Sequence, residues 1–156
     1  MNFSVLMSVY FKENPEYFDL ALKSNLLDQT LKPSEFILVC DGPLNIELEK
    51  VIEKYSELFP EIFKVYRLSK NGGLGEALNY GLKKCMYEII ARSDSDDICV
   101  AERFEKQIEF LKNNRDVAVL GTAIDEFDSD PNKRVFLKLL PTNSVELYEF
   151  AKFRSP

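Results

Sequence analysis

Short apolar runs rich in β-branched and aromatic residues alternate with amphipathic segments along this 156-residue chain, and this alternation limits the folds open to it. The apolar runs predict strands over residues 3–10, 35–40, 63–68, 88–92, 117–122 and 135–140. The amphipathic segments predict helices over residues 15–27, 46–59, 101–113 and 144–153, and a further helix that opens in the glycine-rich loop 69–75 and ends near Lys84. The alternation therefore predicts an α/β fold, with a mostly parallel sheet, helices on both faces and right-handed crossovers.

Composition narrows the classes of function. A hydrophobic fraction of 46% is enough for one domain core, and a net charge of -6 argues against nucleic acid as the main partner. No apolar run approaches the roughly 20 residues of a transmembrane helix, and the first residues lack the basic region of a secretory signal. The three cysteines, Cys40, Cys85 and Cys99, lack metal-ligand spacing, so we expect reduced thiols and a cytoplasmic location, including the inner face of the membrane. The absence of histidine excludes imidazole-based nucleophile systems and zinc sites with imidazole ligands.

Three carboxylates stand within four residues where the strand predicted over 88–92 ends: Asp94, Asp96 and Asp97. Two carboxylates about 6 Å apart repel by about 3 kcal/mol at an effective dielectric constant of about 20. Such a cluster is either fully solvated or arranged around a cation. Mg²⁺ and Mn²⁺ commonly bind through one or two carboxylates plus substrate phosphates. The cluster alone leaves open a metal–diphosphate site and an ordinary acidic turn.

Other polar residues follow the remaining predicted strands. Tyr10 ends the first strand, Asp41 ends the second, and the loop 69–75 follows the third. Open α/β sheets bind ligands at the carboxyl ends of their strands, so we expect these positions at one edge. Each also has an ordinary interpretation: a core tyrosine, a turn aspartate and a loop that supplies positive φ. The loop contains neither a dinucleotide fingerprint nor a P-loop.

Taken together, these motifs resemble the nucleotide-sugar-binding half of family 2 glycosyltransferases, a large inverting family with the GT-A fold. The resemblance runs from Phe3 to about Gly121. It is carried by Ser8-Val9-Tyr10, Gln29-Thr30, Cys40-Asp41-Gly42, Asn71-Gly72-Gly73 with Ala77 and Asn79, and Asp94-Ser95-Asp96-Asp97.

The resemblance implies a role for each position. Tyr10 would pack on the nucleotide base, and Asp41 would accept a hydrogen bond from it. Asp94 and Asp96 would form the family's D-x-D pair, in which Asp94 faces the ribose or sugar and Asp96 holds Mn²⁺ or Mg²⁺ on the diphosphate, with Asp94 as a second candidate ligand. Asp97 would be the extra acid that often follows this pair. The implied nucleotide-sugar-binding set is Ser8, Tyr10, Asp41, Asn71, Gly73, Asp94 and Ser95.

The chain also departs from the family pattern. Cys40 replaces the first acid of the D-D-G-S turn and Pro43 replaces its serine, which alters base recognition. The resemblance places the general base in an acceptor-binding part beyond the segment seen here, so we assign no catalytic residue. We expect residues 1–156 to form a single nucleotide-sugar-binding domain that lacks this part. The late carboxylates in 125–134 are expected to belong to a solvated acidic loop.

The resemblance implies transfer of a sugar, with inversion and divalent-metal assistance, from a nucleoside-diphosphate sugar to an acceptor hydroxyl in polysaccharide biosynthesis. A UDP-sugar is the favoured donor, and a glycan or lipid-linked molecule is the expected acceptor. One alternative is a nucleotide-sugar-binding module without turnover. Another is a metal-dependent phosphoacceptor or nucleotidyl-transfer domain. A phospho-receiver gathers its acids after the first and third strands, whereas here they follow the second and fourth, which disfavours that alternative.

Overall fold

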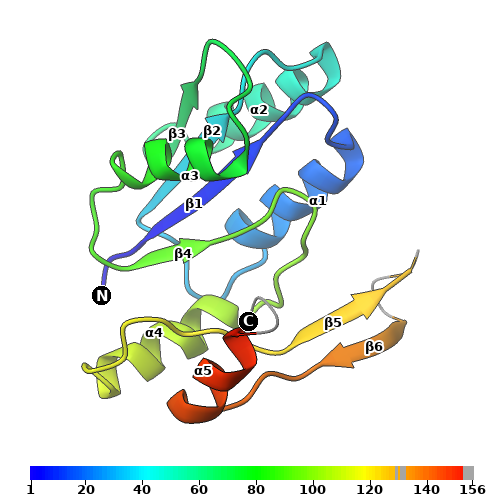
Figure 1. Ribbon diagram of the computed structural model, residues 1–156. Helices are drawn as coiled ribbons and strands as arrows, with labels where there is room; N and C mark the ends of the chain where they lie inside the picture. Colours follow the sequence, from blue (N-terminus) through cyan, green and yellow to red (C-terminus); the bar gives the residue numbers. More distant parts are fainter. Residues whose placement is uncertain (129, 131–132, 153–156) are drawn as a thin grey trace. The chain divides into compact units, whose positions relative to one another are not determined.

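The computed structural model describes residues 1–128, 130 and 133–152, and contacts divide the chain into two compact units, Met1–Asn113 and Asn114–Pro156. The first unit holds a four-stranded sheet in the order β3-β2-β1-β4, in which all neighbouring strands are parallel (Figure 1). Its elements are β1 (Ser4–Val9), α1 (Pro15–Leu26), β2 (Glu35–Cys40), α2 (Ile46–Leu58), β3 (Phe63–Arg67), α3 (Leu74–Leu82), β4 (Ile90–Arg92) and α4 (Arg103–Asn113). This arrangement confirms the predicted α/β class with a parallel sheet.

Helices cover both faces of this sheet, because side chains alternate along the two central strands. Val5 and Met7 of β1 belong to a core that also contains Phe18 of α1, Leu48 of α2 and Phe104 of α4. On the opposite face, Leu6, Ile37 and Val39 pack with Ala77 of α3. Each fully buried large apolar side chain contributes about 1.5–3 kcal/mol relative to an exposed one.

Capping residues fix where the chain leaves the sheet for the next helix. The Asn14 side chain accepts a hydrogen bond from the Glu16 amide at 2.8 Å, and Pro15 occupies the first helical position. The Asn45 side chain accepts from the Leu48 amide at 2.9 Å and caps α2. The Asn45 side-chain amide also donates to the Phe11 carbonyl oxygen at 3.2 Å, so the loops after β1 and β2 meet at the carboxyl ends of the parallel strands.

The second unit contains an antiparallel pair, β5 (Ile124–Phe127) with β6 (Arg134–Lys138), followed by α5 (Ser144–Ala151). The strand predicted over 117–122 is wrong: that segment is not in regular structure, and Val119 is 89% exposed. The acidic loop predicted over 125–134 is also wrong at its ends, because β5 and the start of β6 lie there. An ion pair at 2.7 Å between Arg134 and Asp125 spans the two strands.

The last two predicted elements are close to the observed ones. The strand predicted over 135–140 is β6, and the helix predicted over 144–153 is α5, although Phe153 lies outside the described residues. Among residues 1–128, 130 and 133–152, no helix combines the length and the apolar character needed to cross a membrane.

Candidate functional site

A cavity of about 330 Å³ lies at the carboxyl ends of the strands of the first unit. Such a volume falls within the range typical of small-molecule sites. The end of β1 and the segments that follow β2, β3 and β4 all contribute to its wall. The structure brings together in this wall every residue that the sequence predicted for the site: Ser8, Tyr10, Asp41, Asn71, Gly73, Asp94, Ser95 and Asp96.

The Asp41 carboxylate holds the loop that follows β3. Its two oxygens accept hydrogen bonds from the backbone amides of Gly72 at 2.7 Å and Gly73 at 2.9 Å. The Asn71 side chain donates to the Asp41 carbonyl oxygen at 3.2 Å. Asp41 is only 4% exposed, and each carboxylate oxygen keeps a further lone pair. The same group can therefore order the loop and accept a hydrogen bond from a ligand in the cavity.

The turn after Asp41 requires glycine. Gly42 has φ +85°, and a Cβ atom there would lie 2.7 Å from the Asn71 backbone nitrogen. Just before it, burial raises the pKa of the Cys40 thiol to about 11, although the positive charge of Arg67 lowers it in part. Cys40 is therefore a neutral thiol where an acid was expected from the family pattern, and the Arg67 guanidinium pairs instead with both oxygens of Glu49 at 2.7 and 2.8 Å.

The acidic segment after β4 presents its carboxylates unequally. Both oxygens of Asp94 pair with the guanidinium of Arg92, whereas Asp96 is exposed at the cavity. Partial desolvation, followed by the negative charges of Asp94 and Asp96, raises the pKa of the Asp97 carboxyl, and the nearby cations Arg92 and Arg103 offset this only in part. The segment therefore carries negative charge that its own neighbours do not fully balance.

Tyr10 offers an aromatic surface at the same cavity. The residue is 42% exposed, and its ring lies edge-on to Phe11 with the centroids 6.0 Å apart. A half-exposed aromatic ring at the rim of a cavity can pack against a planar group such as a nucleotide base.

Comparison with known proteins identifies the family. The family model described as "Glycosyl transferase family 2" matches residues 4–154. This chain belongs to glycosyl transferase family 2. Among its relatives, the amylovoran biosynthesis glycosyltransferase AmsE of Erwinia amylovora is 43% identical over 99% of this chain and 56% of its own length. The UDP-Gal:alpha-D-GlcNAc-diphosphoundecaprenol beta-1,3-galactosyltransferase of Escherichia coli is 38% identical over 99% of this chain and 54% of its own length.

Solved structures support the same fold. The structure of S. aureus TarS 1–349 in complex with UDP-GlcNAc is 28% identical, with a TM-score of 0.63 over 74% of this chain and 32% of that one. The GT-A-like class predicted from the sequence is thereby confirmed. The chain spans about half the length of the curated relatives that it matches.

Among the residues that the structure describes, the carboxylates do not build a metal site by themselves. Within the described ranges, no group of three or more histidine, cysteine, aspartate or glutamate side chains is arranged to hold an ion. The donor set at the cavity, exposed Asp96 with Asp94 beside it, fits only a cation that takes one or two carboxylates and completes its shell with substrate phosphates and water.

Glu13 also lines the cavity, although it is not among the site residues predicted from the sequence. One Glu13 carboxylate oxygen accepts a hydrogen bond from the Ser95 hydroxyl at 2.5 Å, and the other accepts from the Asn14 amide at 2.9 Å. Glu13 thereby connects the loop after β1 with the acidic segment. In the sequence, Glu13 stands beside the helix cap Asn14, as an ordinary turn residue does. Its position shortly after the first strand is the signal that would place it at the same sheet edge as Tyr10.

Proposed function

We propose that the cavity binds the nucleoside diphosphate of a sugar donor, and that residues 1–156 form the nucleotide-sugar-binding part of an inverting glycosyltransferase. One observation carries this proposal: residues predicted for donor binding from four separate strand ends line a single cavity. Membership of glycosyl transferase family 2 supports it independently. A binding module without turnover is not favoured, because relatives over nearly the whole chain are named as glycosyltransferases.

Each residue of the cavity then has a role in donor binding. The exposed ring of Tyr10 packs on the base. The Asp41 carboxylate, which keeps free lone pairs, accepts a hydrogen bond from the ring N–H of uracil. Ser8, Asn71, Gly73 and Ser95 line the space left for the ribose and diphosphate. Asp94, held by Arg92, faces the ribose or the sugar.

Asp96 is the residue that would hold Mn²⁺ or Mg²⁺ on the diphosphate, with Asp94 as the second candidate. When bound, the cation neutralises the charge that develops on the leaving diphosphate. The unbalanced charge of the segment around Asp97 favours a cation there. A Pyrobaculum calidifontis mannosyltransferase of similar fold, at 18% identity, was solved in complex with GDP-Man and Mn²⁺. That complex concerns the mannosyltransferase itself, and it motivates the choice of Mn²⁺ for the test.

The names of the relatives suggest the substrates. The Escherichia coli relative is named for UDP-Gal and a diphosphoundecaprenol-linked acceptor, and TarS was solved with UDP-GlcNAc. We therefore propose a UDP-sugar donor, a glycan or lipid-linked acceptor and a role in polysaccharide biosynthesis. We further propose that the reaction takes place at the inner face of the membrane.

A thermal-shift panel tests the proposal. UDP-, GDP-, CDP- and dTDP-sugars are each added to the chain with and without Mn²⁺, and free nucleosides serve as controls. Ligand at 100 times its Kd stabilises the folded state by about 2.7 kcal/mol, which gives a measurable rise in Tm. The expected result is a Mn²⁺-dependent rise that is largest for the UDP-sugars. If no nucleoside-diphosphate sugar raises Tm with or without metal, the proposal is wrong.

A further inference from the structure

Helix α1 buries two polar residues where its apolar face would favour hydrophobic ones. Ser24 is 2% exposed and Asn25 is not exposed at all. The Asn25 side-chain amide donates to the Ala21 carbonyl oxygen at 2.8 Å, which leaves its own oxygen directed away from the helix backbone. Asn25 contacts the residue before the acidic segment 94–97, and Ser24 contacts a residue after it.

One group of hydrogen bonds, which we call the first anchor, fixes Ser93, the residue just before that segment. The Ser93 hydroxyl donates to the Asn25 side-chain oxygen at 2.8 Å and accepts from the Arg103 guanidinium at 2.8 Å. The same guanidinium donates to the Arg92 carbonyl oxygen at 2.7 Å. The hydrogen bonds run in one direction, from Arg103 through Ser93 and Asn25 to Ala21, so each polarises the next.

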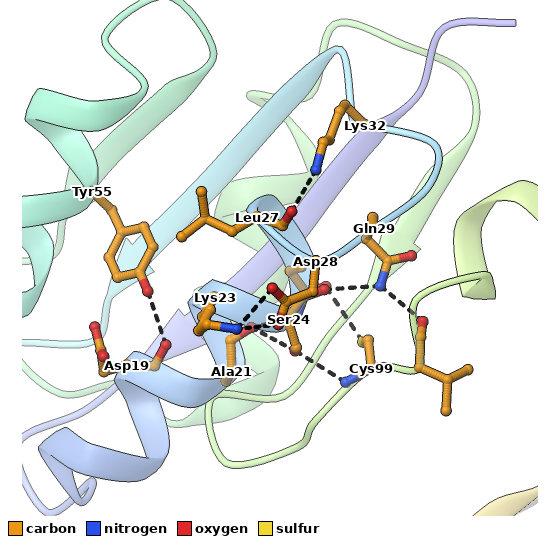
Figure 2. Close-up of polar contacts among 12 residues, drawn as sticks. Asp19, Ala21, Lys23, Ser24, Leu27, Asp28, Gln29, Lys32, Tyr55 and Cys99 are labelled. Carbon is orange, nitrogen blue, oxygen red and sulfur yellow. Dashed lines mark hydrogen bonds and ion pairs between the residues drawn. The ribbon is translucent and has the colours of Figure 1, made fainter.

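The second anchor fixes the residues just after the segment. The Ser24 hydroxyl accepts from the Cys99 amide at 3.0 Å. The Gln29 side chain donates to the Val100 carbonyl oxygen at 2.9 Å, and the Thr30 amide donates to that of Ala101 at 2.9 Å. Figure 2 shows Ser24, Gln29 and Cys99 meeting beside α1. These contacts span about 70 residues of sequence.

A network of this kind holds a segment in place more than it stabilises the fold. Replacing both partners of a buried hydrogen bond with apolar groups can be nearly neutral for stability, whereas the directional contacts fix the register of the chain. Between the two anchors lie Asp94, Ser95 and Asp96, all of which line the cavity. A displacement of about 1 Å in such groups is enough to weaken the function of a site.

We infer that Asn25, Ser93 and Arg103 are positioning residues that hold the acidic segment 94–97 in the geometry required for ligand binding. The identity of the ligand rests on the proposed function. The statement that the network fixes the segment is independent of that function.

Two measurements on the 156-residue chain test the inference. Ser93→Ala removes the central hydroxyl, and Ser93→Ala with Asn25→Leu removes both partners. The matched control is Ser56→Ala, which removes a hydroxyl that bonds only within α2, to the Ile52 carbonyl oxygen at 2.8 Å. The amides of residues 93 and 99 donate to the Leu6 carbonyl oxygen and the Ser24 hydroxyl, each at 3.0 Å, so their hydrogen exchange reports on the two ends of the segment. Calorimetric titration with UDP in the presence of Mn²⁺ reports on the site.

We expect exchange at the amides of residues 93 and 99, which bracket the segment, to quicken about three- to tenfold in both Ser93 variants, with strand β2 unchanged, as loss of one or two hydrogen bonds implies. The affinity for UDP with Mn²⁺ should fall about three- to tenfold, and the double variant should stay as stable as the single one. Ser56→Ala should match the wild type in both measurements.

The inference is overturned if exchange at the amides of residues 93 and 99 does not change, if it quickens equally in β2, or if affinity is unchanged despite faster exchange. Failure of the wild type to bind any nucleoside diphosphate would instead remove the proposed function. In that case the exchange measurement still decides whether the network holds the segment.

Discussion

Carboxylates at the two ends of the parallel sheet lie in opposite electrostatic environments. At the amino end, Glu35 at the start of β2 has a side chain only 3% exposed. Its carboxylate accepts hydrogen bonds from the Ser4 hydroxyl at 2.7 Å, the Lys64 ammonium at 2.8 Å and the Met86 amide at 2.8 Å. At the carboxyl end, the segment with Asp96 and Asp97 surrounds part of a cavity and is not balanced in this way.

The pKa values at the two ends shift in opposite directions. Burial tends to raise the pKa of Glu35, but the hydrogen bonds from Lys64, the Met86 amide and Ser4 outweigh it and leave this pKa below its usual value. Desolvation and neighbouring carboxylates raise the pKa of Asp97. The ionised form is therefore favoured by folding at one end and disfavoured at the other. The amino end serves the fold, and the carboxyl end keeps charge that a bound cation would relieve.

The largest effect is expected at the amino end. Glu35→Gln should lower the free energy of unfolding by about 3 kcal/mol, because it breaks a buried ion pair and leaves the remaining partners poorly matched. Since the folded pKa of Glu35 is lowered, the advantage of the wild type is fully present above about pH 4.3 and is lost as the pH falls through the folded pKa. Urea unfolding at pH 7 and at several values between about pH 4.3 and pH 3 measures both effects.

The Glu35 variant also separates the two ends. Its affinity for UDP with Mn²⁺, measured where the variant is fully folded, should equal that of the wild type. A variant that keeps its stability but loses UDP affinity would mean that Glu35 supports the cavity, and the contrast between the two ends would not hold.

The next effect concerns Asp41. Asp41→Ala should weaken both uridine and UDP by about 1.5–3 kcal/mol, because it removes a charge-assisted acceptor and the group that orders the loop at Gly72 and Gly73. Asp41→Asn is the matched control: it keeps a carbonyl oxygen that can accept from the amides of Gly72 and Gly73 but removes the charge. Calorimetry that finds no loss in Asp41→Asn would assign the effect of Asp41→Ala to loop order alone. An unchanged uridine affinity in Asp41→Ala would contradict base recognition.

A smaller effect is expected at Asp96. Asp96→Asn should remove the Mn²⁺-dependent gain in UDP affinity, a loss of about tenfold or 1.4 kcal/mol, while affinity without metal stays the same. Stability without metal should stay equal or rise, because one source of repulsion is removed. Titrations with and without Mn²⁺ measure the two terms, and Asp116→Asn, at an acid outside the cavity lining, is the control. A metal-dependent gain that survives in Asp96→Asn would place the cation elsewhere.

Much of the fold could be predicted from sequence, because its signals are local. The helix starts at Asn14-Pro15 and Asn45 and the apolar run of β2 fix elements within a few residues. The strand predicted over 117–122 fails for the opposite reason. An apolar run needs a partner to become a strand, and β6 pairs instead with Ile124–Phe127. The acids of that segment look like a loop in the sequence, but Arg134, which lies opposite Phe127, forms an ion pair with Asp125 across the two strands.

The site was predictable as a set of strand ends but not in its internal contacts. Parallel topology brings Tyr10, Asp41 and the acidic segment to one edge, so their presence around one cavity follows from the order of the elements. The contact of Glu13 with Ser95 and the burial of Asn25 against Ser93 join residues far apart in sequence. No local pattern distinguishes such residues from turn or surface residues, and Asn25 is a polar residue on the otherwise apolar face of α1.

The smallest effect is expected at the carboxyl end, where removal of a carboxylate should raise the free energy of unfolding, the opposite of the effect expected at Glu35. Asp97→Asn should raise the free energy of unfolding at pH 7, by up to about 0.5 kcal/mol for a residue this exposed. The folded pKa of Asp97 is raised, so the wild type loses stability as the pH rises through that pKa and has lost none below the unfolded value of about 3.9. The advantage of the variant should therefore shrink as the pH falls from 7 towards 4, whereas the disadvantage of Glu35→Gln should shrink only as the pH falls below about 4.3. Urea unfolding of both variants from pH 7 to about pH 3 measures the two trends together. Mn²⁺ with UDP should also abolish the advantage of Asp97→Asn, because the bound cation removes the repulsion that the substitution relieves. An Asp97→Asn variant that is less stable than the wild type at pH 7 would show that this carboxylate supports the fold, and the two ends of the sheet would then not differ in kind.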